Sequence, residues 1–283
     1  MTATTSLSTL TALYGPLDLD YSEEMSGPYE DLTFRSDECT VIAGLKDDHI
    51  TGFWRPVVAT GFDSLLKEQI VRLYNICRNI TYMDFLIDGN LSAISKFLLG
   101  KGYSARPYFT QIIDLTKSKE QLHSELRKSY KSIVNKTPII SVMKDVAPYK
   151  RLHAEIKGQK RSPESWFIQQ KMLWNGQAFC LLQSKVIDPQ TAWSLAGGLF
   201  YCNDHCCYYA SGCSSVGVDG HNIIWEAILY AKERGCKTFE MGEQVFSGDQ
   251  KQMDIAKFKR GFGGNTVTRL ILERKKNEVL DSV

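Results

Sequence analysis

The stretch that decides the fold runs from Cys206 to Gly264. It begins CCYYASGCSSVGVDGHNIIWEAILYAKERGCKTFEMGEQ (206–244) and, after a polar gap, ends DIAKFKRGFGG (254–264). An aromatic strand leads through a turn-rich loop into a helix that Gly235 terminates, and a short strand with two glutamates follows. Strand, loop, helix and strand in this order are typical of α/β folds, which present ligands at helix N-termini.

The composition is that of a globular protein with an uneven charge distribution. The 283 residues suffice for one large domain or two ordinary ones, with 43% hydrophobic residues and a formal net charge of +2. Residues 1–50 carry ten acidic and two basic residues, whereas residues 117–161 carry twelve basic and four acidic ones. This asymmetry fits a nucleic-acid surface, or two oppositely charged segments that face each other.

The sequence gives no sign of export. The first twenty residues lack a basic region and a sustained apolar core, and no run of 18 apolar residues occurs. The eight cysteines are scattered through a chain too long to need disulfides. We therefore expect a cytoplasmic protein with free thiols and no transmembrane segment.

The first half of the chain alternates strands and helices after an irregular lead-in, residues 1–36. The strands are expected at 39–45, 80–87 and 107–115, and the helices at 63–78, 91–103 and 119–136. Thr116 or Ser118 is expected to cap the last of these helices.

The second half is richer in strands. After a strand at 140–146, helices are expected at 147–157 and 163–175, and then strands at 178–186, 191–202, 205–213, 238–243 and 266–274. Asn203 and Asp204 are expected to form a hairpin turn. The strand ITYMDFLIDGN (80–90) and the helix before it resemble the helix and strand that end in CKTFEMGEQ (236–244). Two copies of one α/β unit would explain the length of the chain.

Several common sites are excluded. No GxSxG, Walker, GxGxxG or HExxH motif occurs, so a hydrolase triad or a nucleoside-triphosphate site is unsupported. Cys202, His205, Cys206 and Cys207 are close in sequence, but neighbouring residues of a strand point to opposite faces. No second Cys/His pair lies at ligand spacing, and we expect no metal.

Glu240, Glu243 and Lys259 are the candidate catalytic residues. Either glutamate can act as general base for an attacking amine, and in a regular strand the two lie on opposite faces. The rings of Phe258 and Phe262 would anchor their segment while Lys259 stabilises developing negative charge. The alternatives are salt-bridged or exposed glutamates and a plain surface lysine.

Two other features leave a choice open. The loop 213–221 places helix N–H groups where an anion can bind, but Asp219 would repel a phosphate or merely cap the helix. Trp225 either stacks on a ligand or fills the core. The cations Arg127, Lys128, Lys131 and Lys136 either bind phosphate or form a solvated helix face.

The quoted stretch resembles the second half of the FemAB-like branch of the GNAT acyltransferase superfamily, which includes peptidoglycan bridge-forming aminoacyltransferases. The motif His153, Gly158, Arg161, Ser165, Trp166 and Gln169 and the terminal FKRGFGG carry the resemblance, which covers about residues 120–274. It implies an α/β fold of tandem GNAT-like domains, with mixed twisted sheets flanked by helices. We expect a degenerate N-terminal copy at 37–145 and a C-terminal copy at 146–283.

The resemblance also implies roles for single residues. In the family, the lysine at the position of Lys259 stabilises the transition state, and Arg161 corresponds to a basic residue that faces a substrate phosphate or carboxylate. Substrate contacts are expected from His153, Arg161, Trp166, Gln169, Tyr208, Tyr209, His221 and Trp225.

Two departures bear on the donor. The acyl-CoA signature of ordinary GNATs is absent from residues 213–221, and the coiled-coil arm of some bridge-forming members is missing. The version of the motif is closer to relatives associated with surface sugars.

We therefore expect a bacterial cell-envelope N-acyltransferase without a permanently bound cofactor. It would move an acyl or aminoacyl group from acyl-CoA or aminoacyl-tRNA to an amine of a sugar, a surface polysaccharide or a peptidoglycan precursor. The alternatives are a tRNA-binding protein that uses the basic surface at 127–161, or a non-catalytic scaffold.

Overall fold

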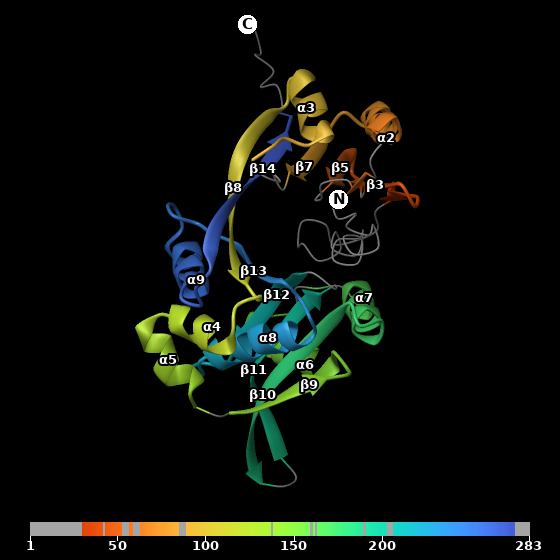
Figure 1. Cartoon of the computed structure of the whole chain (residues 1–283). Helices are drawn as coiled ribbons and strands as arrows, with labels where there is room; N and C mark the ends of the chain where they lie inside the picture. The colour runs from red at the N-terminus through yellow and green to blue at the C-terminus, as the bar shows by residue number, and fades with distance from the viewer. Residues whose placement is uncertain are drawn as a thin grey trace, which may run out of the picture. The chain divides into compact units, whose positions relative to one another are not determined.

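The computed structural model describes residues 30–274 except 42, 53–56, 59–62, 85–88, 137, 159–160, 162, 189–190 and 203–205 (Figure 1). The chain forms two compact units. The first unit consists of residues 1–108 with 268–283, and the second of residues 109–267. No helix in the described ranges is long and apolar enough to cross a membrane.

The first unit contains a small mixed sheet. Its strands follow the order β1 (Glu30–Asp31), β4 (Gly44–Lys46), β5 (His49–Gly52) and β7 (Ile80–Asp84), and the second half of β14 (Asn265–Glu273) pairs antiparallel with β7. Because β5 and β7 are parallel, helix α2 (Asp63–Ile76) connects them as a crossover. Helix α3 (Ala93–Gly100) follows, and β2 (Phe34–Arg35), β3 (Cys39–Val41) and β6 (Val57–Val58) form a second sheet.

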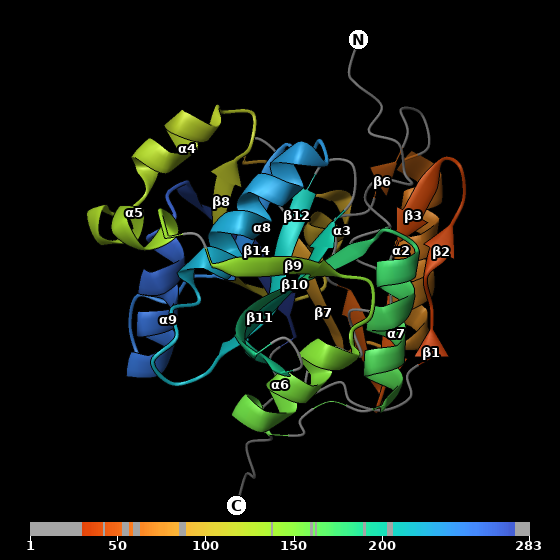
Figure 2. The same cartoon turned by 90° about the horizontal axis from the view of Figure 1, so that it is seen from below.

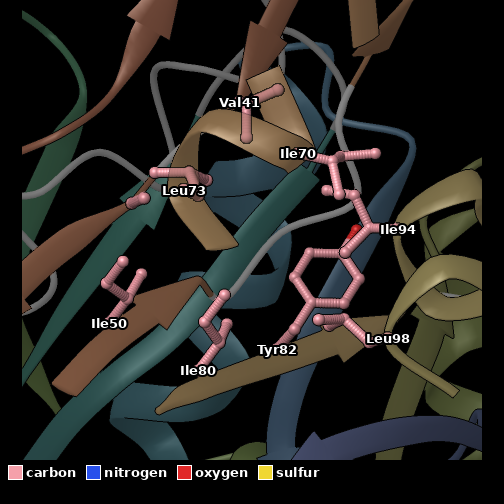
Figure 3. Close-up of a pocket in the computed structure, with 9 residues that line it drawn as sticks. Val41, Ile50, Ile70, Leu73, Ile80, Tyr82, Ile94 and Leu98 are labelled. Carbon is pink, nitrogen blue, oxygen red and sulfur yellow. The ribbon is translucent and has the colours of Figure 1, made fainter. Parts of the chain in front are cut away.

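The core of the first unit contains a small apolar pocket (Figure 3). Side chains from α2, α3 and the strands line it, namely Val41, Ala43, Ile50, Ile70, Leu73, Ile80, Tyr82, Ile94 and Leu98. None of the residues expected to bind substrate belongs to this lining. The nearby Asp84 carboxylate accepts hydrogen bonds from Ser92 N and Ser95 Oγ at 2.7 and 2.5 Å, which ties the end of β7 to the start of α3.

The second unit is built on a larger sheet. From the first half of β14 the strand order is β8 (Ser104–Asp114), β13 (Thr238–Glu243), β12 (Cys206–Ser214), β11 (Thr191–Cys202), β10 (Ala178–Asp188) and β9 (Ile139–Met143). Strands β12 and β13 are parallel and are joined by α8 (His221–Glu233). The other helices are α4 (Lys119–Glu125), α5 (Lys128–Val134), α6 (Ala147–Lys157), α7 (Pro163–Trp174) and α9 (Gln250–Arg260).

Two neighbouring glycines of β11 show that helices cover both faces of this sheet (Figure 2). A β-carbon at Gly198 would collide with Phe200 and touch Ile223 of α8, whereas one at Gly197 would collide with Leu182 and with Tyr149 of α6. The two faces are called the α8 face and the α6 face below. The main core of the unit lies on the α8 face and includes residues of α4, α5 and α8.

The internal repeat expected from the sequence is visible in the order and connection of the strands and helices. In both units a strand, a helix and a parallel strand (β5–α2–β7 and β12–α8–β13) are followed by a further helix and strand. The predicted fold class, an α/β fold of mixed sheets flanked by helices in two copies, is confirmed.

The compact units have other bounds than the ranges 37–145 and 146–283 expected from the sequence. The second unit begins at Phe109, because the following part of β8 pairs with β13 and because Leu122 and Leu126 belong to the same core as α8. Strand β14 passes from the second unit into the first.

Most predicted helices and strands are present, with several differences. The strand expected at 39–45 is divided between β3 and β4, which belong to different sheets, and β5 and β6 were not predicted. The expected lead-in contains the short strands β1 and β2, and residues 1–29 lie outside the described ranges, as does the turn at Asn203 and Asp204. The helix expected at 119–136 is two helices, because Arg127 leaves the helical path and its N–H donates to Gly261 O at 2.8 Å. The strand expected at 140–146 ends at Met143. Helix α9 was not predicted, and Asp249 caps it through Gln252 N at 2.8 Å.

Candidate functional site

A β-bulge at the end of β13 organises the candidate site. Glu240 pairs with Ile112 of β8 and Gly242 with Gln111, so Met241 is the extra residue. Gly242 has φ +76°, a left-handed conformation that a side chain would strain. Glu243 pairs with Thr110.

The bulge brings Glu240 and Glu243 to the same face of the sheet, which corrects the expectation of opposite faces. Paired residues of neighbouring strands share a face, and so do residues two apart on one strand. The partners of the two glutamates, Ile112 and Thr110, are two apart. The extra residue therefore reverses the alternation and gives one face two carboxylates.

The Glu240 side chain is held inside the unit. It is 2% exposed, and its Oε1 accepts a hydrogen bond from Thr110 Oγ1 at 2.9 Å. Glu243, at the end of the strand, is exposed. The site thus combines one buried carboxylate of fixed orientation with one carboxylate that solvent reaches.

Lys259 lies in the last turn of α9, between two anchored aromatic residues. Phe258 and Phe262 pack against the core of the α8 face, with Phe262 2% exposed. Lys259 Nζ reaches the Glu243 carbonyl oxygen at 3.5 Å, the limit of a hydrogen bond. Burial lowers the pKa of Lys259 to about 8, although the carboxylates of Glu243 and Glu240 raise it. The rings therefore hold an amine that titrates close to neutral pH beside the carboxylates.

Tyr208 completes this end of the sheet. It pairs with Glu240 in the parallel register and so shares its face. A β-carbon at position 242 would lie 3.2 Å from the Tyr208 hydroxyl oxygen and 3.5 Å from Lys259 Nζ. The Tyr208 hydroxyl and the Lys259 amine therefore both lie close to the backbone of Gly242. A side chain at this position would contact both groups.

Tyr209 lies elsewhere. It pairs with Phe200, stacks on that ring at 5.6 Å between centroids and packs against the core of the α8 face. Of the two adjacent tyrosines expected to line a cleft, the structure therefore places Tyr208 beside Glu240 and Lys259, and Tyr209 on the opposite face.

A second cluster joins α6 and α7 and unites four of the expected substrate-binding residues. The His153 ring makes an edge contact with Trp166 at 5.7 Å, and the Arg161 guanidinium lies 4.8 Å above the same indole. Arg161 Nη1 also donates to Gln169 Oε1 at 3.4 Å. His153, Trp166 and Gln169 are buried, so this aromatic cluster fixes a guanidinium at its edge.

Tyr149 places the aromatic cluster on the α6 face. Its ring contacts both His153 and Trp166, and its hydroxyl shares a hydrogen bond with Ser211 Oγ of β12. Ser211 pairs with Leu199, two residues before the partner of Tyr208, so both belong to one face of the sheet. The aromatic cluster and the Glu240–Lys259 site therefore share the α6 face of the second unit.

His221 and Trp225 of α8 lie on the α8 face. The His221 ring is 4.1 Å from that of Tyr130 and 4.9 Å from that of Phe258. Burial lowers its pKa, and within the described ranges its Nδ1 has no hydrogen bond. Trp225 is 4% exposed and belongs to the core, so neither residue meets the carboxylates and the lysine.

The N-terminus of α8 is not capped as expected. Gly220 is the N-cap, without a side-chain hydrogen bond, and Asp219 Oδ1 lies 3.8 Å from His221 Nδ1. The interpretation of Asp219 as the cap is therefore wrong. Its exposed carboxylate lies at the helix start, where it opposes the binding of an anion.

Two further groups of residues complete the description. Among the described residues no group of three or more His, Cys, Asp or Glu side chains is placed to hold a metal ion; His205 lies outside them. Of the basic residues near 127–136, Arg127 donates to Lys257 O at 2.9 Å and Lys131 to Ser124 O at 2.8 Å. These two cations serve the local fold.

Sequence reasoning missed Thr110, Gly242 and Tyr149. Thr110 contacts Glu240 across 130 residues of sequence, and Tyr149 reaches Ser211 across 62. A glycine between the two glutamates was the one visible signal, since a glycine inside a strand often marks a bulge.

Comparisons with known proteins identify the fold. No family model matches the sequence, and no curated protein matches it. Among solved structures, FemX superposes with a TM-score of 0.67 at 14% identity over 90% of each chain. The C-terminal domain of a putative lysylphosphatidylglycerol synthetase from Agrobacterium fabrum gives 0.60 at 12% identity, over 94% of this chain and 90% of that one. L-PGS from Bacillus licheniformis gives 0.58 at 11%, over 89% and 86%. The resemblance to the FemAB-like branch is thus confirmed at the level of the fold.

Proposed function

We propose that this chain is an acyl- or aminoacyltransferase whose reacting groups meet at the end of β13. The convergence of Glu240, Glu243, Lys259 and Tyr208 on one sheet face carries the proposal. An amine that titrates near neutral pH beside two carboxylates is the arrangement that acid–base chemistry needs, and perturbed pKa values gather at functional sites. The FemX-like fold supports the same reaction class.

In the proposed reaction the acceptor amine attacks the carbonyl carbon of the activated donor. A carbon–nitrogen bond forms and the bond to the leaving group breaks, at sulfur in an acyl-CoA or at a ribose oxygen in an aminoacyl-tRNA. The amine proton passes to Glu240 or Glu243, directly or through water. Because the pKa of Lys259 is about 8, most of its amine is protonated at pH 7 and faces the oxyanion as a cation.

Arg161 is the proposed anchor for the acceptor. Trp166 and Gln169 hold its guanidinium on the face that also carries Tyr208. A planar guanidinium binds phosphate or carboxylate through two parallel hydrogen bonds. We propose a sugar or a cell-wall precursor with a phosphate or carboxylate as the acceptor, and the cytoplasm as the location.

The first experiment identifies the ligands. Thermal-shift measurements with acyl-CoAs, aminoacyl-tRNA and nucleotide-activated amino sugars report binding, because a ligand of the folded state raises the melting temperature. A donor and an acceptor that both raise it then enter a transfer assay. If no pair among these classes both binds and reacts, the proposed function is wrong.

Variants then test the roles. Lys259→Ala is expected to lower kcat about 10²- to 10³-fold, the usual loss of one oxyanion donor. Lys257→Ala is the matched control, because Lys257 is exposed on the same helix. A Lys259→Ala enzyme with near-full turnover would contradict the oxyanion role. Glu240→Gln and Glu243→Gln, compared in the same assay, show which carboxylate takes the proton.

A further inference from the structure

We propose that Lys259 is itself a site of acylation, at which activated acyl groups form an amide that removes the positive charge from the site. The consequence, a transferase switched off by its own class of donor, rests on the proposed function. The covalent chemistry does not, because any reactive acyl compound that reaches the amine can take part.

The geometry leaves the amine accessible to a small electrophile. Lys259 Nζ has one hydrogen bond at the 3.5 Å limit, and in the described part of the chain no carboxylate lies within 4.0 Å of it. Gly242, which has no side chain, lies beside it, and a β-carbon there would be 3.5 Å from Lys259 Nζ and 3.2 Å from the Tyr208 hydroxyl oxygen. An acyl carbonyl that reaches Gly242 meets the amine of Lys259, with the Tyr208 hydroxyl close to the same position.

The surroundings keep part of this amine neutral. Burial lowers its pKa to about 8, and Glu243 and Glu240 of β13 oppose the shift. Two other cations near α9 have partners elsewhere: Arg127 donates to Lys257 O and Arg260 to Gln244 Oε1 at 3.0 Å. At pH 7.5 roughly a quarter of an amine with pKa 8 is neutral, against about 0.1% for an ordinary lysine.

The step balances without a further reagent. The neutral Nζ attacks the carbonyl carbon, a carbon–nitrogen bond forms, and the leaving group departs with the electrons of its bond. The proton lost from Nζ passes through a water molecule to the Glu243 carboxylate, which is exposed, and from there to bulk solvent. The product is a neutral amide, which cannot stabilise an oxyanion as the ammonium does.

The test uses the full chain and p-nitrophenyl acetate as the probe, with acetylation of each lysine followed by peptide mass spectrometry. At pH 7.5 Lys259 is expected to react about tenfold faster than Lys257, because its larger neutral fraction outweighs the lower nucleophilicity of a weaker base. The rate at Lys259 should reach half its maximum near pH 8. In Glu243→Gln this midpoint should move to lower pH, because a carboxylate that favours the ammonium is gone.

The outcomes separate the inference from the proposed function. A Lys259 that reacts no faster than Lys257, or with a midpoint above about pH 10, the range of an ordinary lysine, overturns the inference. Selective reaction at Lys259 supports it even if no acceptor for the enzyme is found. If transfer activity depends on Lys259 but p-nitrophenyl acetate does not acetylate Lys259 selectively, the proposed function stands and only the inference of acylation is overturned.

Discussion

Replacing Lys259 with methionine is expected to stabilise the folded protein at neutral pH. The charged form of Lys259 destabilises the folded state, because burial disfavours the ammonium and the two carboxylates compensate only in part. Methionine keeps the length of the apolar stem and carries no charge to desolvate. If Lys259 instead stabilised the fold through its packing, replacing it with methionine would lower the stability.

The magnitude follows from the shift of the pKa. Its ordinary value is 10.5 and its value in the fold is about 8. Each unit corresponds to about 1.4 kcal/mol, so the full shift corresponds to about 3 kcal/mol. Because Lys259 keeps part of its surface in contact with solvent, we expect the gain in unfolding free energy to be about 2 kcal/mol at pH 7.

The gain in unfolding free energy from Lys259→Met is expected to depend on pH. Below pH 8 the lysine is protonated in both states, and the folded protein bears the whole cost of the buried charge. Between pH 8 and 10.5 only the unfolded chain still holds the proton, so the stability of the wild type rises with pH in this window. The advantage of Lys259→Met should therefore shrink across that window and vanish above it.

Urea unfolding at pH 7 and at pH 10, followed by circular dichroism, measures the difference. Lys257→Met is the matched control and should change the unfolding free energy by less than about 0.5 kcal/mol, because this lysine is exposed. A Lys259→Met protein that is less stable than the wild type at pH 7, or a gain independent of pH, would refute the electrostatic reasoning.

Three further predictions concern the structure around the site. Gly264→Ala should destabilise the fold by about 3 kcal/mol or more in urea unfolding, because Gly264 has φ +77° and a β-carbon there would collide with the Ile112 carbonyl; a loss below 1 kcal/mol would contradict the packing of this segment on β8. Ser118→Ala should cost about 1 kcal/mol, since the Ser118 and Gln121 side chains form a reciprocal capping box at α4. His221→Phe should make stability less dependent on pH below the ordinary pKa of histidine. Burial lowers the pKa of His221, so the wild type loses stability as the pH falls through that region and thermal melts at pH 7 and pH 5 should diverge between the two proteins.

The sequence predicted the elements whose side chains alternate or repeat clearly. Helix α8, which the sequence predicts at 222–234, and strand β13 lie within one residue of their predicted bounds, because an apolar stripe and a terminating glycine delimit the helix. Helix α9 was missed because Ala256 is its only buried residue among those described, so it has no apolar stripe to detect. The cap at Asp249, Phe258 in its last turn and Phe262 just after it position the helix instead.

The site was only partly predictable for a related reason. Its residue types were recognisable, but their meeting depends on pairing between distant strands. Whether Tyr208 or Tyr209 faces Glu240 depends on the register of β12 with β13, and no local pattern states it. Whether Glu240 and Glu243 share a face depends on one extra residue in the pairing with β8.

The candidate site residues also differ in whether their surroundings in the fold are energetically favourable. Trp225 and Tyr209 contribute to the core: Trp225 is buried, and the ring of Tyr209 stacks on that of Phe200. Lys259, by contrast, keeps a charge that burial opposes. Folding alone would not select such a cost, and an electrostatically unfavourable residue beside two carboxylates points to function. By this criterion we propose the end of β13, and not the start of α8, as the place of the reaction.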